Sequence, residues 1–199
     1  MLALEEETLS GRICPMEEDE LIQRSREGDV DCFNQLVERY QREVYNLSLR
    51  MLGNAQAAED ATQDAFISAF NGISRFRGGS FRAWLLRIAA NACRDQLRSL
   101  RRRPTTSLEA LPLELELDRH VSSPEEYALS RELGQEIRKA LSTLPADQRL
   151  AVILRDILGL DYEEIAQATA SSLGTVKSRI SRGRTRLRHH LEQYRELFP

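Results

Sequence analysis

Residues 161–190 read DYEEIAQATASSLGTVKSRISRGRTRLRHH, and this stretch decides the architecture of the C-terminal part of the chain. A short amphipathic segment capped by Asp161 ends at a turn of small residues, 169–172, and a longer basic helix follows from Leu173. A short helix, a turn of about four residues and a longer second helix have the spacing of a helix-turn-helix. The sequence therefore predicts a DNA-binding motif here.

The second helix of this motif has an apolar and a polar face at about 100° per residue. Its inward face is formed by Val176, Ile180, Gly183 and Leu187. Small polar residues point outward between two rows of cations, which suits the base edges and the two phosphate backbones of a major groove. The predicted contact residues are Ser172, Thr175, Lys177, Ser178, Arg179, Ser181, Arg182 and Arg186.

Apolar residues recur at helical spacing through almost every other window, and strand signals are nearly absent, so we predict an all-α protein. The expected helices span 30–52, 55–73, 81–102, 124–144, 145–158, 162–168 and 173–194. Asp29 is placed to cap the first of these, and Gly53 is placed to end it. We expect two small helical domains, 20–103 and 124–199, joined by a flexible acidic linker, 104–123, after a disordered acidic tail, 1–19.

The charges are unevenly distributed along the chain, although 28 basic and 31 acidic residues leave a net charge of only −3. Residues 75–103 carry nine arginines and one aspartate, and residues 174–190 carry six basic residues and no acid. Between them, residues 104–173 hold thirteen acids and six bases. A surface designed only for solubility would intersperse the signs, so two basic blocks indicate two anion-binding faces.

The first basic block places Arg87, Asn91, Arg94 and Arg98 within a sector of about 60° on one helix. The preceding loop carries Phe76 between two arginines and before a Gly-Gly pair. Aromatic surface beside cations is what recognition of a single strand requires, so we predict that Phe76 and this helix face bind single-stranded nucleic acid.

The helix expected at 55–73 should bury its alanines with Phe66 and Phe70 and expose an acidic face. This acidic face consists of Glu59, Asp60, Gln63 and Asp64. We predict that it docks a protein partner. The alternative is a nuclease that uses the three carboxylates to hold a metal, but no His, Cys or Lys accompanies them. There is also no P-loop, nucleophile elbow or zinc signature, so we expect no enzyme, metal or cofactor.

The longest apolar run, Leu150–Leu154, has five residues, whereas a membrane span needs about 20. The acidic start has no signal-peptide pattern, and three widely spaced cysteines indicate free thiols. We therefore expect a soluble cytoplasmic protein without membrane insertion.

Two sets of motifs resemble those of extracytoplasmic-function sigma factors of the sigma-70 family. Residues 58–66 (AEDATQDAF), 76–78 (FRG) and 80–91 (SFRAWLLRIAAN) resemble region 2. Residues 144–156, 159–166 (GLDYEEIA) and 174–179 (GTVKSR) resemble region 4. The two sets occur in the family's order.

The resemblance implies a promoter-specificity subunit of bacterial RNA polymerase that serves transcription initiation, as in stress responses. The acidic face would dock on the β′ coiled coil of core polymerase, and Asn91 with the Phe76 loop would hold a flipped base of the minus-ten element. Region 4 would read the minus-thirty-five element as duplex and touch the β flap. An anti-sigma factor is a further implied partner. The alternative is a stand-alone helix-turn-helix regulator whose N-terminal domain senses a ligand or dimerises.

Overall fold

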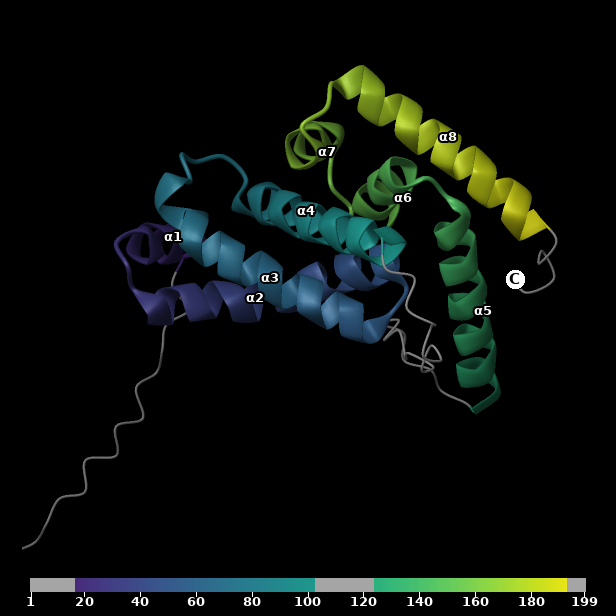
Figure 1. The fold of residues 1–199 in the computed structure, drawn as a ribbon, viewed down its shortest axis with the longest axis horizontal. Coiled ribbons are helices and arrows are strands. Elements are labelled where there is room, and N and C mark those ends of the chain that lie inside the picture. The colour runs from purple at the N-terminus through teal and green to yellow at the C-terminus, as the bar shows by residue number, and fades with distance from the viewer. Residues whose placement is uncertain (1–16, 103–123, 193–199) are drawn as a thin grey trace, which may run out of the picture.

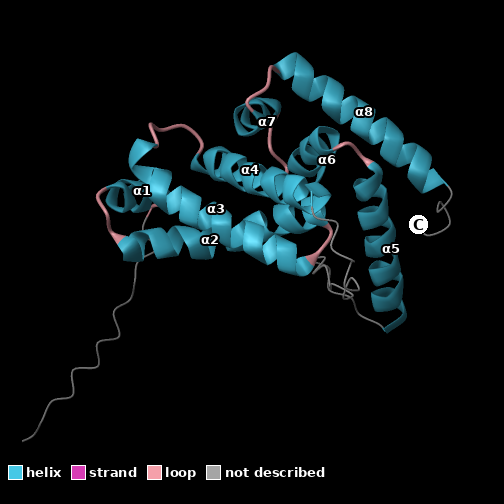
Figure 2. Ribbon diagram, viewed as in Figure 1, coloured by secondary structure: helices cyan, strands magenta, loops and turns pink. Residues whose placement is uncertain are grey.

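The computed structural model describes residues 17–102 and 124–192, and within these ranges it contains helices, turns and no strand (Figures 1 and 2). The predicted all-α fold is confirmed. The elements are α1 (Glu18–Arg26), α2 (Val30–Leu52), α3 (Ala55–Gly72), the 3-10 turn η1 (Ile73–Arg75), α4 (Phe81–Arg102), α5 (Pro124–Thr143), α6 (Ala146–Val152), the π-helical turn η2 (Ile153–Ile157), α7 (Tyr162–Thr169) and α8 (Leu173–Leu191).

Short polar side chains and glycine set the ends of α2 and α3, and of these the sequence predicted the Asp29 cap and the Gly53 stop. The Asp29 carboxylate accepts a hydrogen bond from the Cys32 amide at 3.0 Å, and the Asn54 side chain accepts one from the Ala57 amide at 2.9 Å. Gly53 ends α2 at φ 72°, a left-handed conformation that glycine adopts without steric cost. These caps turn α3 back against α2.

The N-terminal part is a helical bundle in which α2, α3 and α4 all pack on one another and α1 packs on α2 (Figure 1). The face of α3 toward this core is formed by Ala58, Ala61, Ala65 and Ala69, all fully buried. Small side chains let the helix backbones approach closely. The expected burial of Phe70 is wrong: its ring is 40% exposed, because Phe70 lies outside the sector of the alanines and packs edge-on against Phe33 at the rim.

Helix α1 begins at Glu18, so the prediction of disorder through residue 19 is wrong for its last residues. The Tyr40 hydroxyl donates a hydrogen bond to Glu18 Oε2 at 2.6 Å, and Leu21 is buried. The acidic residues here are visible in the sequence, but the contact between Glu18 and the distant Tyr40 is not. Residues 1–16 of the predicted tail and the whole predicted linker, 104–123, lie outside the described residues.

The C-terminal part contains the expected helix-turn-helix, formed by α7 and α8. Asp161 and Glu164 make a reciprocal capping box at the start of α7, with the Glu164 amide donating to Asp161 at 2.7 Å. Ala170 carries the turn at φ 49°, and Ser172 caps α8. The helix expected at 145–158 is instead α6 followed by η2, a π-helical turn that apolar spacing does not predict.

The two parts touch each other, which the sequence analysis did not anticipate. Helix α7 packs on α4 (Figure 1). An Arg149 guanidinium nitrogen donates to the Met51 carbonyl at 2.6 Å, and Arg82 pairs with Glu43 and donates to the Leu158 carbonyl at 2.6 Å. Arginines thus join the end of α2 and the start of α4 to the C-terminal part.

Candidate nucleic-acid and protein interfaces

The acidic face of α3 is exposed along its whole length. Glu59, Asp60, Gln63 and Asp64 all point away from the buried alanines and are open to solvent. Ile67 and Phe70 continue this surface along α3, with 52% and 40% of their area exposed. Helical spacing did not predict Ile67 as a surface residue, and it predicted Phe70 to be in the core. The structure therefore adds apolar area beside the acids, as a protein-docking surface requires.

The basic face of α4 is also at the surface. Arg87, Asn91 and Arg98 are exposed, and the side chain of Arg94 is 24% exposed. Behind them Ala89, Ala90 and Cys93 are buried, and burial raises the pKa of the Cys93 thiol to about 11. The core thus orients the predicted face toward solvent.

Phe76 is not at the surface with that face. Its ring is 6% exposed and packs 5.7 Å from Phe81 and 5.3 Å from Trp84 between ring centroids. In this conformation the ring stabilises the base of the loop and offers no face on which a nucleotide could stack. Arg75 and Arg77 on either side remain exposed, and Gly78 and Gly79 have φ of 94° and 90°, so the tip needs glycine.

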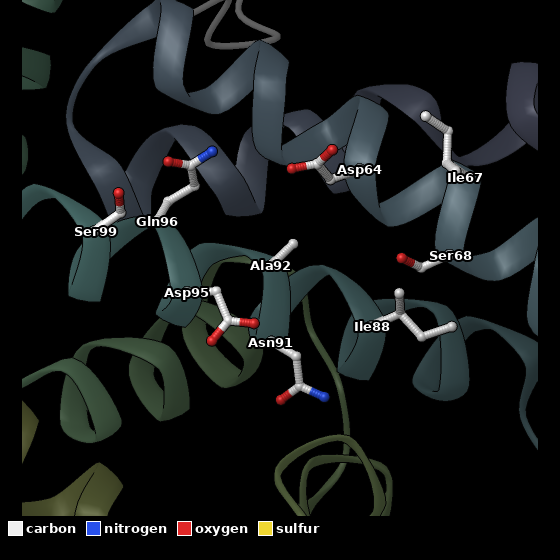
Figure 3. Close-up of a pocket in the computed structure, with 9 residues that line it drawn as sticks. All are labelled: Asp64, Ile67, Ser68, Ile88, Asn91, Ala92, Asp95, Gln96 and Ser99. Carbon is white, nitrogen blue, oxygen red and sulfur yellow. The ribbon is translucent and has the colours of Figure 1, made fainter.

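A groove between α3 and α4 connects the acidic face with the basic face (Figure 3). Its lining residues are Asp64, Ile67, Ser68, Ile88, Asn91, Ala92, Asp95, Gln96 and Ser99. Figure 3 shows Asp64 and Gln96 reaching into the space between the helices, whereas the Asn91 amide points away from α3. The lining combines three apolar residues, Ile67, Ile88 and Ala92, with polar side chains, and residues of both predicted interfaces meet in this one depression.

The inner side of α8 is packed against α6. Val176, Ile180 and Gly183 are buried, as predicted. A Cβ on Gly183 would lie 2.6 Å from Val152 Cγ2, so glycine allows α8 to approach α6 closely. This contact fixes which side of α8 faces outward.

The outer side of α8 carries the predicted contact residues. Ser172, Lys177, Ser181, Arg182 and Arg186 are exposed, and Thr175, Ser178 and Arg179 are half-buried. Two serine hydroxyls bond locally: Oγ of the exposed Ser172 accepts from the Thr175 amide at 3.2 Å, and the half-buried Ser178 donates to the Thr175 carbonyl at 2.9 Å. The long cations are therefore the residues best placed to reach a partner.

Residues from other helices hold the cations in the two rows that flank the outward face of α8, and each row is called a shoulder below. On one shoulder, the Tyr162 ring lies beneath Lys177 Nζ at 5.7 Å and Arg155 Cζ at 4.8 Å, distances typical of cation–π contacts. Arg184 pairs there with Asp156, and this hydrogen bond raises the pKa of Arg184. On the other shoulder, Arg179 donates to Asp147. No local pattern predicts these roles of Tyr162 and Asp147, because both act through contacts with residues on other helices.

The described ranges contain no group of three or more His, Cys, Asp or Glu side chains suited to a metal ion. None of the helices in these ranges is long and apolar enough to cross a membrane.

Family models match both parts of the chain. A Sigma-70 region 2 model matches residues 36–103, and a Sigma-70 region 4 model matches residues 134–187. The chain is 41% identical over 170 residues to the ECF RNA polymerase sigma-E factor of Escherichia coli K12, a match that covers 82% of this chain and 88% of the relative. The chain belongs to the extracytoplasmic-function sigma-factor family. The family predicted from the motifs is therefore confirmed, and it is a family of transcription initiation factors rather than enzymes.

Further relatives agree with this assignment. The ECF RNA polymerase sigma factor SigE of Mycolicibacterium smegmatis is 39% identical over 163 residues, which cover 81% of this chain and 62% of that protein. A structure of CnrH in complex with the cytosolic domain of CnrY superposes with a TM-score of 0.66 at 26% identity, covering 89% of this chain and 99% of that one. A structure of the sigma factor RpoE in complex with the anti-sigma factor NepR from Bartonella quintana superposes with a TM-score of 0.62 at 27% identity, covering 80% of this chain and 96% of that one.

Proposed function

We propose that this chain directs core RNA polymerase to specific promoters and initiates transcription there. The observation that carries the proposal is the coincidence of two family-model matches with two separate basic faces: region 2 covers the basic face of α4, and region 4 covers that of α8. A DNA-binding factor with a single motif needs only one such face. A subunit that contacts two promoter elements needs both.

Region 2 is the part that docks on polymerase in this proposal. The exposed acids of α3 offer the β′ coiled coil a charged surface to bind. Ile67 and Phe70 add apolar surface that becomes buried from water on binding. Asp60 and Asp64 lie one helical turn apart on this surface, so a basic partner can meet both. We place the β-flap contact on region 4 by family resemblance alone.

The basic face of α4 contacts the minus-ten element, with Asn91 reading a flipped base. Its amide can donate and accept at a base edge, and Arg87 and Arg98 are exposed on the same face for the phosphates. Because Phe76 is buried in the aromatic cluster, its proposed contact with the flipped base requires the loop to open first.

Region 4 reads the minus-thirty-five element through α8. Arg182 is the exposed arginine at the centre of the outward face, so it is the residue we assign to a base edge in the major groove. Lys177, held over Tyr162, is assigned to a phosphate. Ser172, Thr175, Ser178, Arg179, Ser181 and Arg186 complete the proposed contact set.

The remaining proposals follow from this function. The factor acts in the cytoplasm, where polymerase and chromosome meet, and it catalyses no reaction of its own. An anti-sigma factor is a proposed partner, since two structural relatives are described in complexes, one of them explicitly with an anti-sigma factor.

Reconstitution tests the proposed function. Purified protein added to core polymerase should start transcription at specific promoters selected from a random library, and core alone should not. If the protein neither copurifies with core polymerase nor directs initiation, but binds duplex DNA by itself, it is a stand-alone helix-turn-helix regulator.

A further inference from the structure

One arginine of the recognition helix α8 is bound to a carboxylate of its own region. Arg184 Nε donates to Asp156 Oδ2 at 3.0 Å, and Arg184 Nη2 donates to Asp156 Oδ1, so the pair is bidentate. Asp156 belongs to η2 and Arg184 to α8, and both lie within the region 4 match. Neither residue belongs to the predicted DNA-contact set, so the pair has no role in the proposed function.

Arg184 lies on the same shoulder of α8 as two other cations. At 100° per residue, Lys177, Arg184 and Arg188 fall within a sector of about 40°. Lys177 lies over the Tyr162 ring and Arg188 is exposed, and within the described part of the chain neither of them pairs with a carboxylate. A row of cations along one side of a recognition helix faces the phosphates of one strand. Arg184 is therefore the member of this row whose charge is neutralised.

Packing of the two backbones fixes both partners of this pair. Gly183, the residue before Arg184, is buried where α8 packs on α6. The η2 turn that carries Asp156 buries Ile153 and Leu154. Because both backbones are already ordered, forming the pair costs little entropy, and bidentate geometry is the case in which a partly exposed ion pair is stable. We therefore expect the pair to persist when DNA approaches α8.

We propose that Asp156 keeps Arg184 from binding a phosphate and so lowers the affinity of region 4 for duplex DNA of any sequence. The inference rests on the proposed function only in taking duplex DNA as the partner of α8. The guanidinium edge bound to Asp156 cannot also donate to a phosphate, and the carboxylate repels a phosphate brought beside it. Phosphate contacts carry no sequence information, so losing one weakens binding to every sequence. The base contact assigned to Arg182 is unaffected.

Counterion release sets the size of this effect. Each phosphate that a protein neutralises steepens the slope of log K against log salt concentration by about 0.9. Freeing Arg184 should therefore steepen that slope by about 0.9, which is an extra loss of affinity of about 3.5-fold between 50 and 200 mM salt. With Arg184 paired, base contacts account for a larger share of the binding free energy of α8.

Three variants separate a freed arginine from a general change of charge. Asp156→Asn removes the carboxylate with little change of shape and frees Arg184. Asp156→Asn combined with Arg184→Gln removes both charges of the pair and keeps the wild-type net charge. Glu163→Gln removes an exposed acid of α7 that is in no ion pair within the described residues, so it changes the charge of region 4 without freeing a cation.

The experiment measures binding of the full-length protein to a short random-sequence DNA duplex by fluorescence anisotropy over a range of salt concentrations. Asp156→Asn should bind about threefold or more tightly than wild type at 50 mM salt, with a slope steeper by about 0.9. The double variant and Glu163→Gln should stay within about twofold of wild type. Circular-dichroism melts check that each variant folds, and Asp156→Ser replaces Asp156→Asn should the latter change the melt.

Three outcomes would overturn the inference. The first is an Asp156→Asn protein that folds but keeps the wild-type affinity and slope, and the second is an equal gain in Glu163→Gln, which would be a general charge effect. The third is a gain in affinity without a steeper slope, which would mean that Arg184 already binds a phosphate in the wild type. A wild-type protein that fails to initiate transcription with core polymerase would instead remove the proposed function, and the random-duplex measurements would still decide the role of Asp156.

Discussion

Replacing Gly183 with alanine should destabilise the protein, although the same replacement on the exposed side of a helix stabilises the helix. Gly183 is buried where α8 meets α6, and an added Cβ would lie 2.6 Å from Val152 Cγ2 and 3.4 Å from the Gln148 carbonyl oxygen. Real Cβ atoms do not approach another atom as closely as 2.6 Å. Either Val152 must move or α8 must shift away from α6.

Two opposing terms set the size of the effect. In a helix interior, alanine raises the free energy of unfolding by about 0.8–1 kcal/mol relative to glycine. Inserting a methyl group into a packed core lowers that free energy by about 1–3 kcal/mol. Val152 is buried and β-branched, so it cannot rotate away cheaply. We expect a net loss of about 1 kcal/mol, or a fall of about 2–4 °C in Tm for a protein of this size.

Thermal unfolding followed by circular dichroism measures this loss, and the same helix supplies the control. Nothing lies within 4 Å of a Cβ on Gly174, so Gly174→Ala should keep or raise Tm. Adding Val152→Ala to Gly183→Ala should relieve the clash, with a favourable coupling of about 1 kcal/mol. If Gly183→Ala raises Tm as much as Gly174→Ala does, the close approach of α8 to α6 is not real.

Three further outcomes follow from exposure and burial. Asp60→Arg combined with Asp64→Arg should abolish binding to core polymerase with an unchanged melt, because both side chains are exposed; normal competition for core would assign the acidic face another role. Asn91→Ala should weaken minus-ten discrimination in transcription assays, whereas Arg182→Ala should cost about 1–3 kcal/mol at particular minus-thirty-five bases; a uniform loss across sequences would make Arg182 a phosphate contact. Burial raises the pKa of the Cys93 thiol from 9.0 to about 11, so the stability that the neutral thiol contributes is complete below pH 9 and is lost as the pH rises to 11. Cys93→Ala should therefore reduce the fall in unfolding free energy between pH 9 and pH 11. An unchanged fall in the variant would show that Cys93 does not cause it.

Local signals predicted the helices, and distant contacts account for what the sequence could not provide. Gly53 and the Asp161 capping box act within a few residues, so their effect is visible in the sequence and the structure agrees. Glu18 joins a helix because Tyr40, 22 residues away, binds it. Phe76 sits among aromatic rings that the loop folds back to meet, and no local pattern separates such a residue from a stacking platform.

The alternation of charge along the chain has two physical meanings, of which the sequence analysis found one. The basic blocks were interpreted as anion-binding faces, and the acidic block between them was predicted to contain an acidic linker, 104–123, followed by helices. Asp147, Asp156 and Glu164 all come from that acidic block, and each binds a residue in or beside a basic block: Arg94 and Arg179, Arg184, and Ser80. Two of these acids, Asp147 and Asp156, thus neutralise cations of the two basic blocks, and Glu164 accepts a hydrogen bond from a hydroxyl beside one of them.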